Sequence, residues 1–129
     1  PANAFNSNHS EQDSFDKRSD DKGAEPEDVQ VAQLQGRTYV FLGLERIGGV
    51  MVFDVTDPRD AQYVTYVNHR DSTVQYDEAD PAGAALAGDL GAEGMVHVPA
   101  SDSPTKTPLL IVANEVSGTT TVWEISLTR

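Results

Sequence analysis

Cysteine is absent from this chain of 129 residues, and basic side chains are few. Without cysteine no disulfide can contribute to stability, and the absence fits either a cytosolic or a bacterial extracellular protein. Nine Lys and Arg residues against 21 Asp and Glu residues give a net charge of −12. Because this charge repels nucleic acid and anionic membranes, we expect no nucleic-acid partner.

Long apolar runs and recognisable catalytic signatures are also absent. No segment approaches the roughly 18 to 20 apolar residues of a membrane span. The G-x-S-x-G elbow of hydrolases, the D-x-D-x-D-G calcium loop and the H-E-x-x-H zinc motif are all missing. His9, His69 and His97 are scattered, which argues against a zinc site. The sequence therefore assigns no catalytic residue, and we expect no organic cofactor.

A repeat of strand, glycine turn and strand is present instead. Residues 41–55 recur as residues 111–125 with an offset of 70, which aligns Glu45 with Glu115 and Phe53 with Trp123. A recurring unit of three or four strands is typical of a propeller blade, and chance similarity of two β-rich segments is the alternative.

A second shared piece precedes each copy. Gly23-Ala24-Glu25 resembles Gly91-Ala92-Glu93 with an offset of 68. We therefore expect Glu93 to be the counterpart of Glu25, with a length difference of two residues absorbed in a loop.

Alternating and β-branched segments predict seven strands. The first unit has four, at 28–33, 37–42, 50–55 and 61–68, and the second has three, at 95–98, 109–116 and 119–127. The predicted organisation is a polar N-terminal segment (1–22), a first blade (23–68), a long connecting loop (69–92) and a second blade (93–129). The N-terminal segment contains Phe5 and Phe15 as its large apolar residues, and either docking onto a sheet or disorder is compatible with it.

The length sets the predicted fold class. A closed propeller needs about four or more blades, so 129 residues are too few. The chain begins Pro1-Ala2-Asn3-Ala4, without initiator methionine or signal peptide, and a final unit of three strands is what a closing blade would look like. We predict an all-β fold of about two antiparallel propeller blades, the C-terminal fragment of a larger ring whose remaining blades, or other envelope proteins, are the partners. A self-contained seven-stranded β-sandwich is the alternative.

Three segments carry a family resemblance: residues 14–27, 43–52 and 114–120. They resemble the C-terminal region of the choice-of-anchor I family. That family comprises secreted or surface-anchored bacterial β-propeller proteins, often labelled alkaline-phosphatase-like, and it is similar to an animal mesenchyme-specific cell-surface glycoprotein. The resemblance implies an architecture and a secreted or cell-surface location more directly than it implies a reaction.

Acidic residues are expected to gather at one end of the blades. In a blade, the loop before the first strand and the turn between the second and third strands emerge on the same side. The predicted metal-binding residues are therefore Glu25, Glu27, Glu45, Glu93 and Glu115. Carboxylate oxygens suit hard cations, and calcium is the expected ion. The alternative, which is the more common role of such residues, is that the glutamates accept hydrogen bonds from turn amides or pair with Arg46.

Three functions follow from these observations. The first is a non-catalytic extracellular or cell-surface propeller segment with a binding or assembly role, stabilised by calcium. The second is part of a metal-dependent phosphatase, in which carboxylates would hold two cations around a phosphate. The third is a structural component of a cell-envelope layer.

Overall fold

The computed structural model describes residues 5–10, 14–76, 83 and 86–127. Parts of the predicted N-terminal segment and of the predicted connecting loop (1–4, 11–13, 77–82 and 84–85) lie outside the described residues. In the part of the chain that the structure describes, no helix has the length and hydrophobicity of a membrane span.

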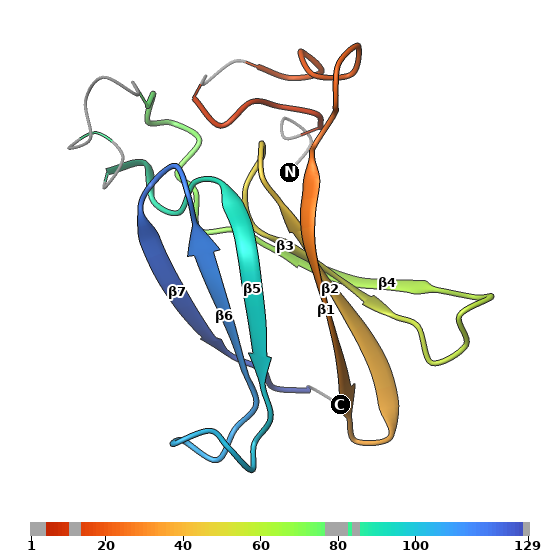
Figure 1. Cartoon of the computed structure of the whole chain (residues 1–129). Coiled ribbons are helices and arrows are strands. Elements are labelled where there is room, and N and C mark those ends of the chain that lie inside the picture. Colours follow the sequence, from red (N-terminus) through yellow and green to blue (C-terminus); the bar gives the residue numbers. More distant parts are fainter. Residues whose placement is uncertain (1–4, 11–13, 77–82, 84–85, 128–129) are drawn as a thin grey trace.

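The described strands form two antiparallel sheets (Figure 1). The four-stranded sheet contains β1 (Pro26–Leu34), β2 (Arg37–Leu44), β3 (Val50–Asp54) and β4 (Gln62–Val67) in that order, and the three-stranded sheet contains β5 (Ala92–Val98), β6 (Leu109–Asn114) and β7 (Thr119–Glu124). The predicted all-β fold with sheets of four and three strands is confirmed. Each sheet is an up-and-down meander, and the described strands close no ring.

The sheets share one hydrophobic core. The four-stranded sheet contributes Phe41 and Val50, and the three-stranded sheet contributes Leu110 and Val112, all of them buried. Strands β1 and β5 lie side by side, and the sheets diverge from them toward β4 and β7 (Figure 1). One face of each of the strands β2 and β6 is buried in this core, and the other face, which carries Val40 and Ile111, is only partly buried.

The two sheets repeat each other in their hydrogen bonding. In the first sheet the N–H of Glu45 donates to the carbonyl of Glu25 at 2.9 Å, and in the second the N–H of Glu115 donates to the carbonyl of Gly91 at 2.7 Å. Both acceptor residues have a left-handed backbone, with φ of 48° at Glu25 and 75° at Gly91. Each opening strand also has a register shift, at Glu27 in β1 and at Glu93 in β5.

This register corrects the alignment expected from the sequence. The counterpart of Glu25 is Gly91, and Glu93 corresponds to Glu27, so the offset of the opening strand is 66 and not 68. The offset of 70 in the following hairpin holds, because Val40 pairs with Phe53 as Leu110 pairs with Trp123. The difference arises because the stretch from Glu93 to Glu115 is four residues longer than that from Glu27 to Glu45.

Phe53 and Trp123 occupy equivalent positions, as expected, but their surroundings differ. Trp123 packs against the shared core. Phe53 lies on the face of its sheet that points away from the second sheet, where its ring meets Tyr63 edge-on at 6.0 Å. The repeat aligns the two rings, but of the two only Trp123 packs between the sheets.

The N-terminal segment is docked mainly through polar contacts. Phe5 and Phe15 pack on each other with ring centroids 6.0 Å apart, yet they remain 57% and 52% exposed. Phe5 borders a shallow hollow beside Met51 and Tyr66. The stronger attachment comes from Arg18 and Lys22, whose side chains bind Glu25.

Candidate functional site

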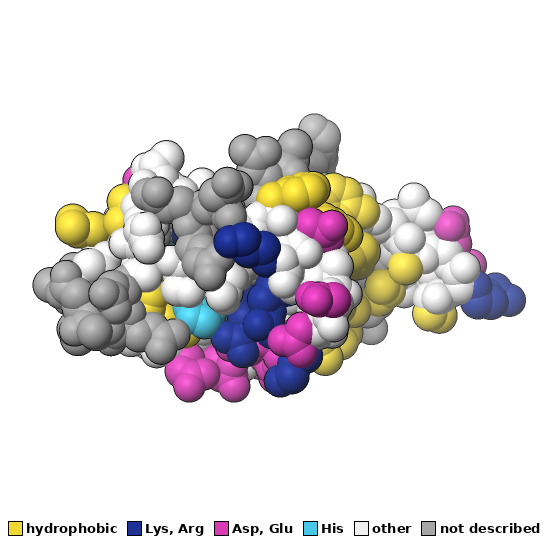
Figure 2. Space-filling model, turned by 90° about the horizontal axis from the view of Figure 1, so that it is seen from above, with side chains coloured by type: hydrophobic (Ala, Val, Ile, Leu, Met, Phe, Trp, Pro, Cys, Tyr) yellow, Lys and Arg dark blue, Asp and Glu magenta, His cyan; other side chains and the backbone are white. Residues whose placement is uncertain are grey.

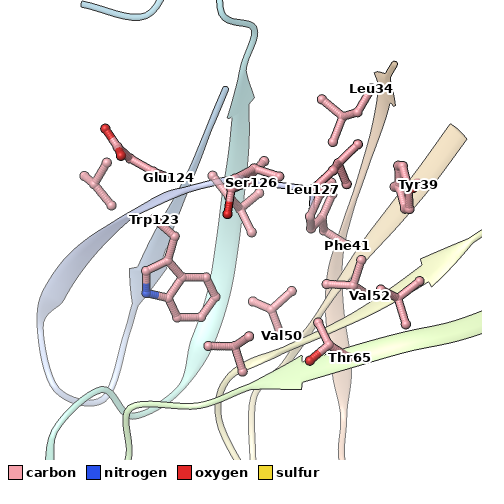
Figure 3. Close-up of a pocket in the computed structure, with 15 residues that line it drawn as sticks. Leu34, Tyr39, Phe41, Val50, Val52, Thr65, Trp123, Glu124, Ser126 and Leu127 are labelled. Carbon is pink, nitrogen blue, oxygen red and sulfur yellow. The ribbon is translucent and has the colours of Figure 1, made fainter. Parts of the chain in front are cut away.

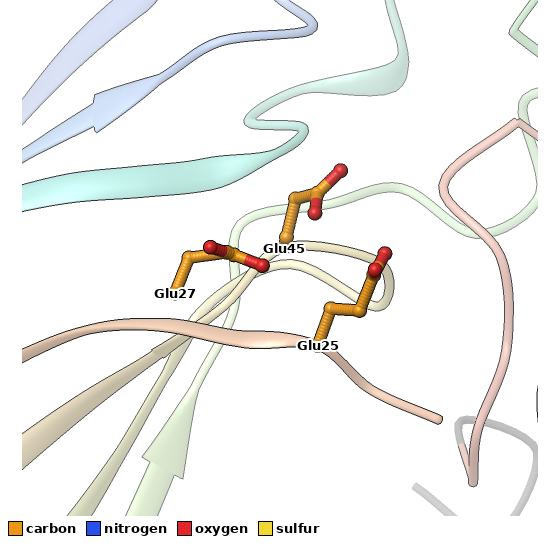
Figure 4. A group of neighbouring side chains, drawn as sticks. All are labelled: Glu25, Glu27 and Glu45. Carbon is orange, nitrogen blue, oxygen red and sulfur yellow. The ribbon is translucent and has the colours of Figure 1, made fainter. Parts of the chain in front are cut away.

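Carboxylates and basic side chains meet at the end of the molecule where β1 begins. Figure 2 shows Lys and Arg side chains gathered near the centre of this end, bordered by Asp and Glu. One carboxylate oxygen from each of Glu25, Glu27 and Glu45 lies within 4.8 Å of the others. Glu25 precedes β1, Glu27 lies on β1, and Glu45 lies in the β2–β3 turn (Figure 4).

Glu25 is the buried centre of an ion network. Its side chain is 3% exposed and accepts hydrogen bonds from the guanidinium groups of Arg46 and Arg18, the latter at 3.3 Å. The ammonium of Lys22 lies 2.8 Å from its other oxygen. The hydrogen bond from Lys22, together with the contacts of Arg46, lowers the pKa of Glu25 from 4.5 to about 2 against the opposing effect of burial. Glu25 is therefore ionised and neutralised by side chains of this chain.

Arg46 connects this network to two further groups. Its Nη1 lies 2.9 Å from a carboxylate oxygen of Glu45 and 3.2 Å from Nδ1 of His9. Arg46 thus ties the β2–β3 turn to the segment before β1 and to the N-terminal segment. This arrangement matches the alternative role foreseen for these glutamates, which is pairing with Arg46.

Glu93, on β5, lies near two other carboxylates, those of Glu115 and Glu27. Burial, followed by repulsion from Glu115 and Glu27, raises the pKa of Glu93. Burial is also the largest cause of the raised pKa of Glu45, where Arg46 opposes it and Glu25 and Glu93 add to it. All five predicted glutamates therefore lie close enough to interact, and the uncompensated charge lies toward the three-stranded sheet.

The second sheet has no equivalent ion network among the described residues. Val116 stands where Arg46 stands in the first sheet, and its N–H donates to the carbonyl of Leu90 at 3.2 Å. Leu90 belongs to a small apolar cluster with Tyr76 and Ala87, against which Val116 packs. The same backbone position therefore supports charge in one unit and apolar packing in the other.

A polar network around Asp89 was not predicted from the sequence. The hydroxyls of Thr119 and Thr121 donate to its carboxylate at 2.8 and 2.5 Å. Nδ1 of His69 lies 3.5 Å from the same carboxylate, and the His69 ring meets Trp123 edge-on at 5.3 Å. Through these contacts His69 and Asp89, near the two ends of the long connection, both bind side chains of β7. Alternation of Thr119 and Thr121 places their hydroxyls on one face, but no local pattern indicates their partner.

His97 lies on β5 and is partly buried. Its Nε2 is buried without a hydrogen-bond partner, and burial lowers the pKa of the ring. A neutral imidazole in this position fits packing against the neighbouring Leu34 and Pro99.

An apolar groove opens where the two sheets diverge. Figure 3 shows Trp123 of β7 across from Val50 and Val52 of β3 and Phe41 of β2. The chain after β7 borders the groove with Ile125 and Leu127, which pack against the shared core. The groove is a continuation of the core and holds no cluster of ionisable groups among the described residues.

Part of the chain matches one known protein family. Residues 2–58 match the model of the Choice-of-anchor I domain, which confirms the predicted resemblance. The chain is also 28% identical over 113 residues to Gigasin-3a from Magallana gigas. That alignment covers 88% of this chain and 40% of Gigasin-3a, so the chain spans less than half the length of this relative. No solved structure matches the chain at a significant level.

Proposed function

We propose that this chain forms two neighbouring blades of a β-propeller that is secreted or displayed at the cell surface and has a binding or assembly role. The observation that carries the proposal is the repeat of hydrogen bonding and register between two sheets stacked through their opening strands. Sheets that repeat in this way are the units from which propellers are built.

The family match supports the proposed location. The name of the Choice-of-anchor I domain, which residues 2–58 match, suggests an extracellular or cell-surface protein. The net charge of −12 is compatible with such a location. The experiment is labelling of intact cells that express the full-length gene product with a membrane-impermeant reagent. Labelling of this chain in intact cells supports the proposal, and labelling only after lysis contradicts it.

The binding or assembly role is tested separately. An isolated envelope fraction is washed in high salt, and the protein is followed by immunoblotting. Retention that is lost on extraction of the envelope layer favours a structural component, whereas release into the medium favours a secreted binding protein.

A metal-dependent phosphatase has less support. Its two cations would need free carboxylates, but Glu25 is already neutralised by Arg18, Lys22 and Arg46. A phosphatase assay on the full-length gene product, with and without chelator, tests this alternative. Turnover that the chelator abolishes would favour the phosphatase over the non-catalytic role.

Calcium remains part of the proposal, with a revised set of ligands. Glu27 and Glu45 have oxygens within 4.8 Å of each other, and Glu93 and Glu115 repel each other nearby. A calcium ion on this side would offset the repulsion that Arg46 relieves only in part. Calcium prefers carboxylate oxygens as ligands, which this group of glutamates supplies. Glu25 would then hold the turn in place through Arg46 and would not be a ligand.

A further inference from the structure

The N-terminal segment contains a buried histidine that the proposed function does not use. His9 is 7% exposed, and its ring lies against the β2–β3 turn, where Nδ1 is 3.2 Å from Nη1 of Arg46. Arg46 in turn binds the buried carboxylate of Glu25. His9 therefore links residues 5–10 to the ion network of Glu25.

The partner of His9 determines which form of its ring fits this contact. A guanidinium group has only hydrogen-bond donors, so the Nδ1 atom that faces Arg46 must offer a lone pair. The ring that fits is therefore the neutral one with its proton on Nε2. Protonation turns Nδ1 into a second donor and brings two cationic groups to a nitrogen–nitrogen distance of 3.2 Å.

The surrounding charges offer little relief to a protonated ring. The charged groups that reach the stretch around His9 or the network of its partner are Arg46 and Glu45 of the β2–β3 turn, Arg18, Asp21, Lys22 and Glu25 before β1, and Arg70 after β4. Both carboxylates next to Arg46 are already bound by basic side chains. Arg70 donates to the carbonyl of Asn8 at 2.6 Å, so a second cation also touches this stretch.

Few apolar contacts oppose the release of residues 5–10. Phe5 is 57% exposed. Two backbone hydrogen bonds join the stretch to the chain that follows it: the N–H of Asp16 donates to the carbonyl of Phe5 at 2.9 Å, and the N–H of Arg18 donates to the carbonyl of Asn6 at 3.0 Å. These two N–H groups therefore report whether the stretch is attached.

The chain after this stretch has its own anchor. Arg18 and Lys22 bind the carboxylate of Glu25, and neither contact involves residues 5–10. Residues 5–10 can therefore open while the segment that leads into β1 stays in place.

We propose that His9 is a pH-sensitive latch, which holds residues 5–10 over Arg46 while its ring is neutral and releases them when the ring is protonated. The closed form carries no proton on Nδ1 and the released form can take one up, so the latch is closed at higher pH and opens as the pH falls through the histidine range, about pH 8 to 5. Because one proton is taken up, the equilibrium constant for opening rises by at most about tenfold per pH unit. The inference rests on contacts of the first unit and needs neither the proposed location nor the proposed role.

The test is hydrogen–deuterium exchange of the full-length gene product between about pH 8 and about pH 5, read by mass spectrometry. Labelling times are scaled to the intrinsic exchange rate at each pH, so that a segment of constant protection exchanges equally in all samples. Peptides that contain Asp16 and Arg18 are expected to lose protection as the pH falls, and a peptide from β6 is expected to keep it.

Two results for the wild type would overturn the latch. One is unchanged protection of the peptides that contain Asp16 and Arg18 over the whole pH range. The other is a parallel loss of protection in β6, because that result means acid unfolding of the sheets and not the release of one stretch.

A variant that cannot titrate identifies the responsible group. In His9→Asn the carboxamide oxygen can replace Nδ1 as the acceptor for Arg46, but it takes up no proton. This variant should stay protected at the acid end of the range, although Glu45, whose pKa is raised by burial, still titrates in it. His69→Asn is the matched control, because His69 is 54% exposed and lies outside the Arg46 contact, and it should open like the wild type.

The variants can also contradict the assignment. A His9→Asn protein that opens with the pH dependence of the wild type, or that is unprotected throughout, would exclude the neutral ring as the latch. So would a His69→Asn protein that no longer opens. None of these results bears on the cell-surface labelling that tests the proposed function.

Discussion

Arg46 and Val116 occupy equivalent positions in the two sheets, and each donates the same backbone hydrogen bond to the segment before its opening strand, at 3.2 Å in both cases. Their side chains reach opposite environments: Arg46 binds the buried Glu25, and Val116 packs against an apolar cluster. The two units therefore share their backbone geometry, but the side chains at this position are charged in the first unit and apolar in the second. Among the described residues, a buried carboxylate held by basic side chains is found in the first unit and has no equivalent in the second.

Replacing Glu25 should destabilise the fold. Glu25→Gln leaves Arg46 and Arg18 without their shared buried carboxylate, and breaking a buried ion pair in this way costs about 3 kcal/mol or more. Urea unfolding followed by circular dichroism measures the loss. A change no larger than that of the control Glu124→Gln, which removes the same charge from an exposed position on β7, would show that the network contributes little.

Replacing Glu93 should stabilise the fold, in contrast to replacing Glu25. Its raised pKa means that the folded state disfavours the ionised carboxylate, so Glu93→Gln should stabilise the protein at neutral pH. Because Glu93 is exposed, the expected gain is small, roughly 0.5 kcal/mol. The measurement is made in chelator, so that no divalent cation masks the repulsion. Destabilisation relative to Glu124→Gln would contradict the charge assignment.

The pH dependence of stability should report on Glu25. Its pKa is about 2 in the folded protein against an ordinary value of 4.5, so its contribution is fully present above about pH 4.5 and is lost as the pH falls toward 2. The difference in unfolding free energy between the wild type and Glu25→Gln should therefore shrink across this window. A difference that stays constant from neutral pH down to pH 2 would exclude the lowered pKa.

Calcium should stabilise the protein beyond the effect of ionic strength. Binding to the folded state alone contributes about 2.7 kcal/mol when free calcium exceeds Kd a hundredfold. Sodium chloride at matched ionic strength is the control, since screening also stabilises an acidic protein.

The double substitution of Glu45 and Glu115 by glutamine should remove the calcium-specific increment in the melting temperature and keep the salt response. Equal shifts with calcium and with matched salt in the wild type would mean that the glutamates serve only as turn and ion-pair residues.

Trp123 should matter more to stability than its counterpart Phe53. Trp123→Ala removes a ring that packs against the shared core and should cost about 3 to 5 kcal/mol. Phe53→Ala should cost less, because that ring lies on the face of its sheet that points away from the second sheet. Trp123→Phe serves as the control that retains most of the packing. Equal losses for the two alanine variants in urea unfolding would contradict the different surroundings of these rings.

Local pattern was sufficient to predict the strands. Alternating side chains in 28–33 and the β-branched run 37–42 specify extended backbone, and Gly48-Gly49 specifies a turn that few other residues permit. At Gly49 φ is 77°, and a Cβ would lie 2.3 Å from the carbonyl oxygen of Val67. Because these constraints act between near neighbours, the sequence by itself determined two antiparallel meanders, their repeat and the glutamates at one end.

The pairing of charges was decided only by the tertiary structure. Glu25 and Arg46 are far apart in the sequence, and nothing local selects Arg46 over a metal ion as the partner of Glu25. The offset of the opening strand was likewise missed, because register shifts at Glu27 and Glu93 change which residues face each other without leaving a clear mark in composition. Electrostatic and packing partners are fixed by distances in space, which strand patterns do not contain. The ion network and the Asp89 contacts therefore emerged only from the folded chain.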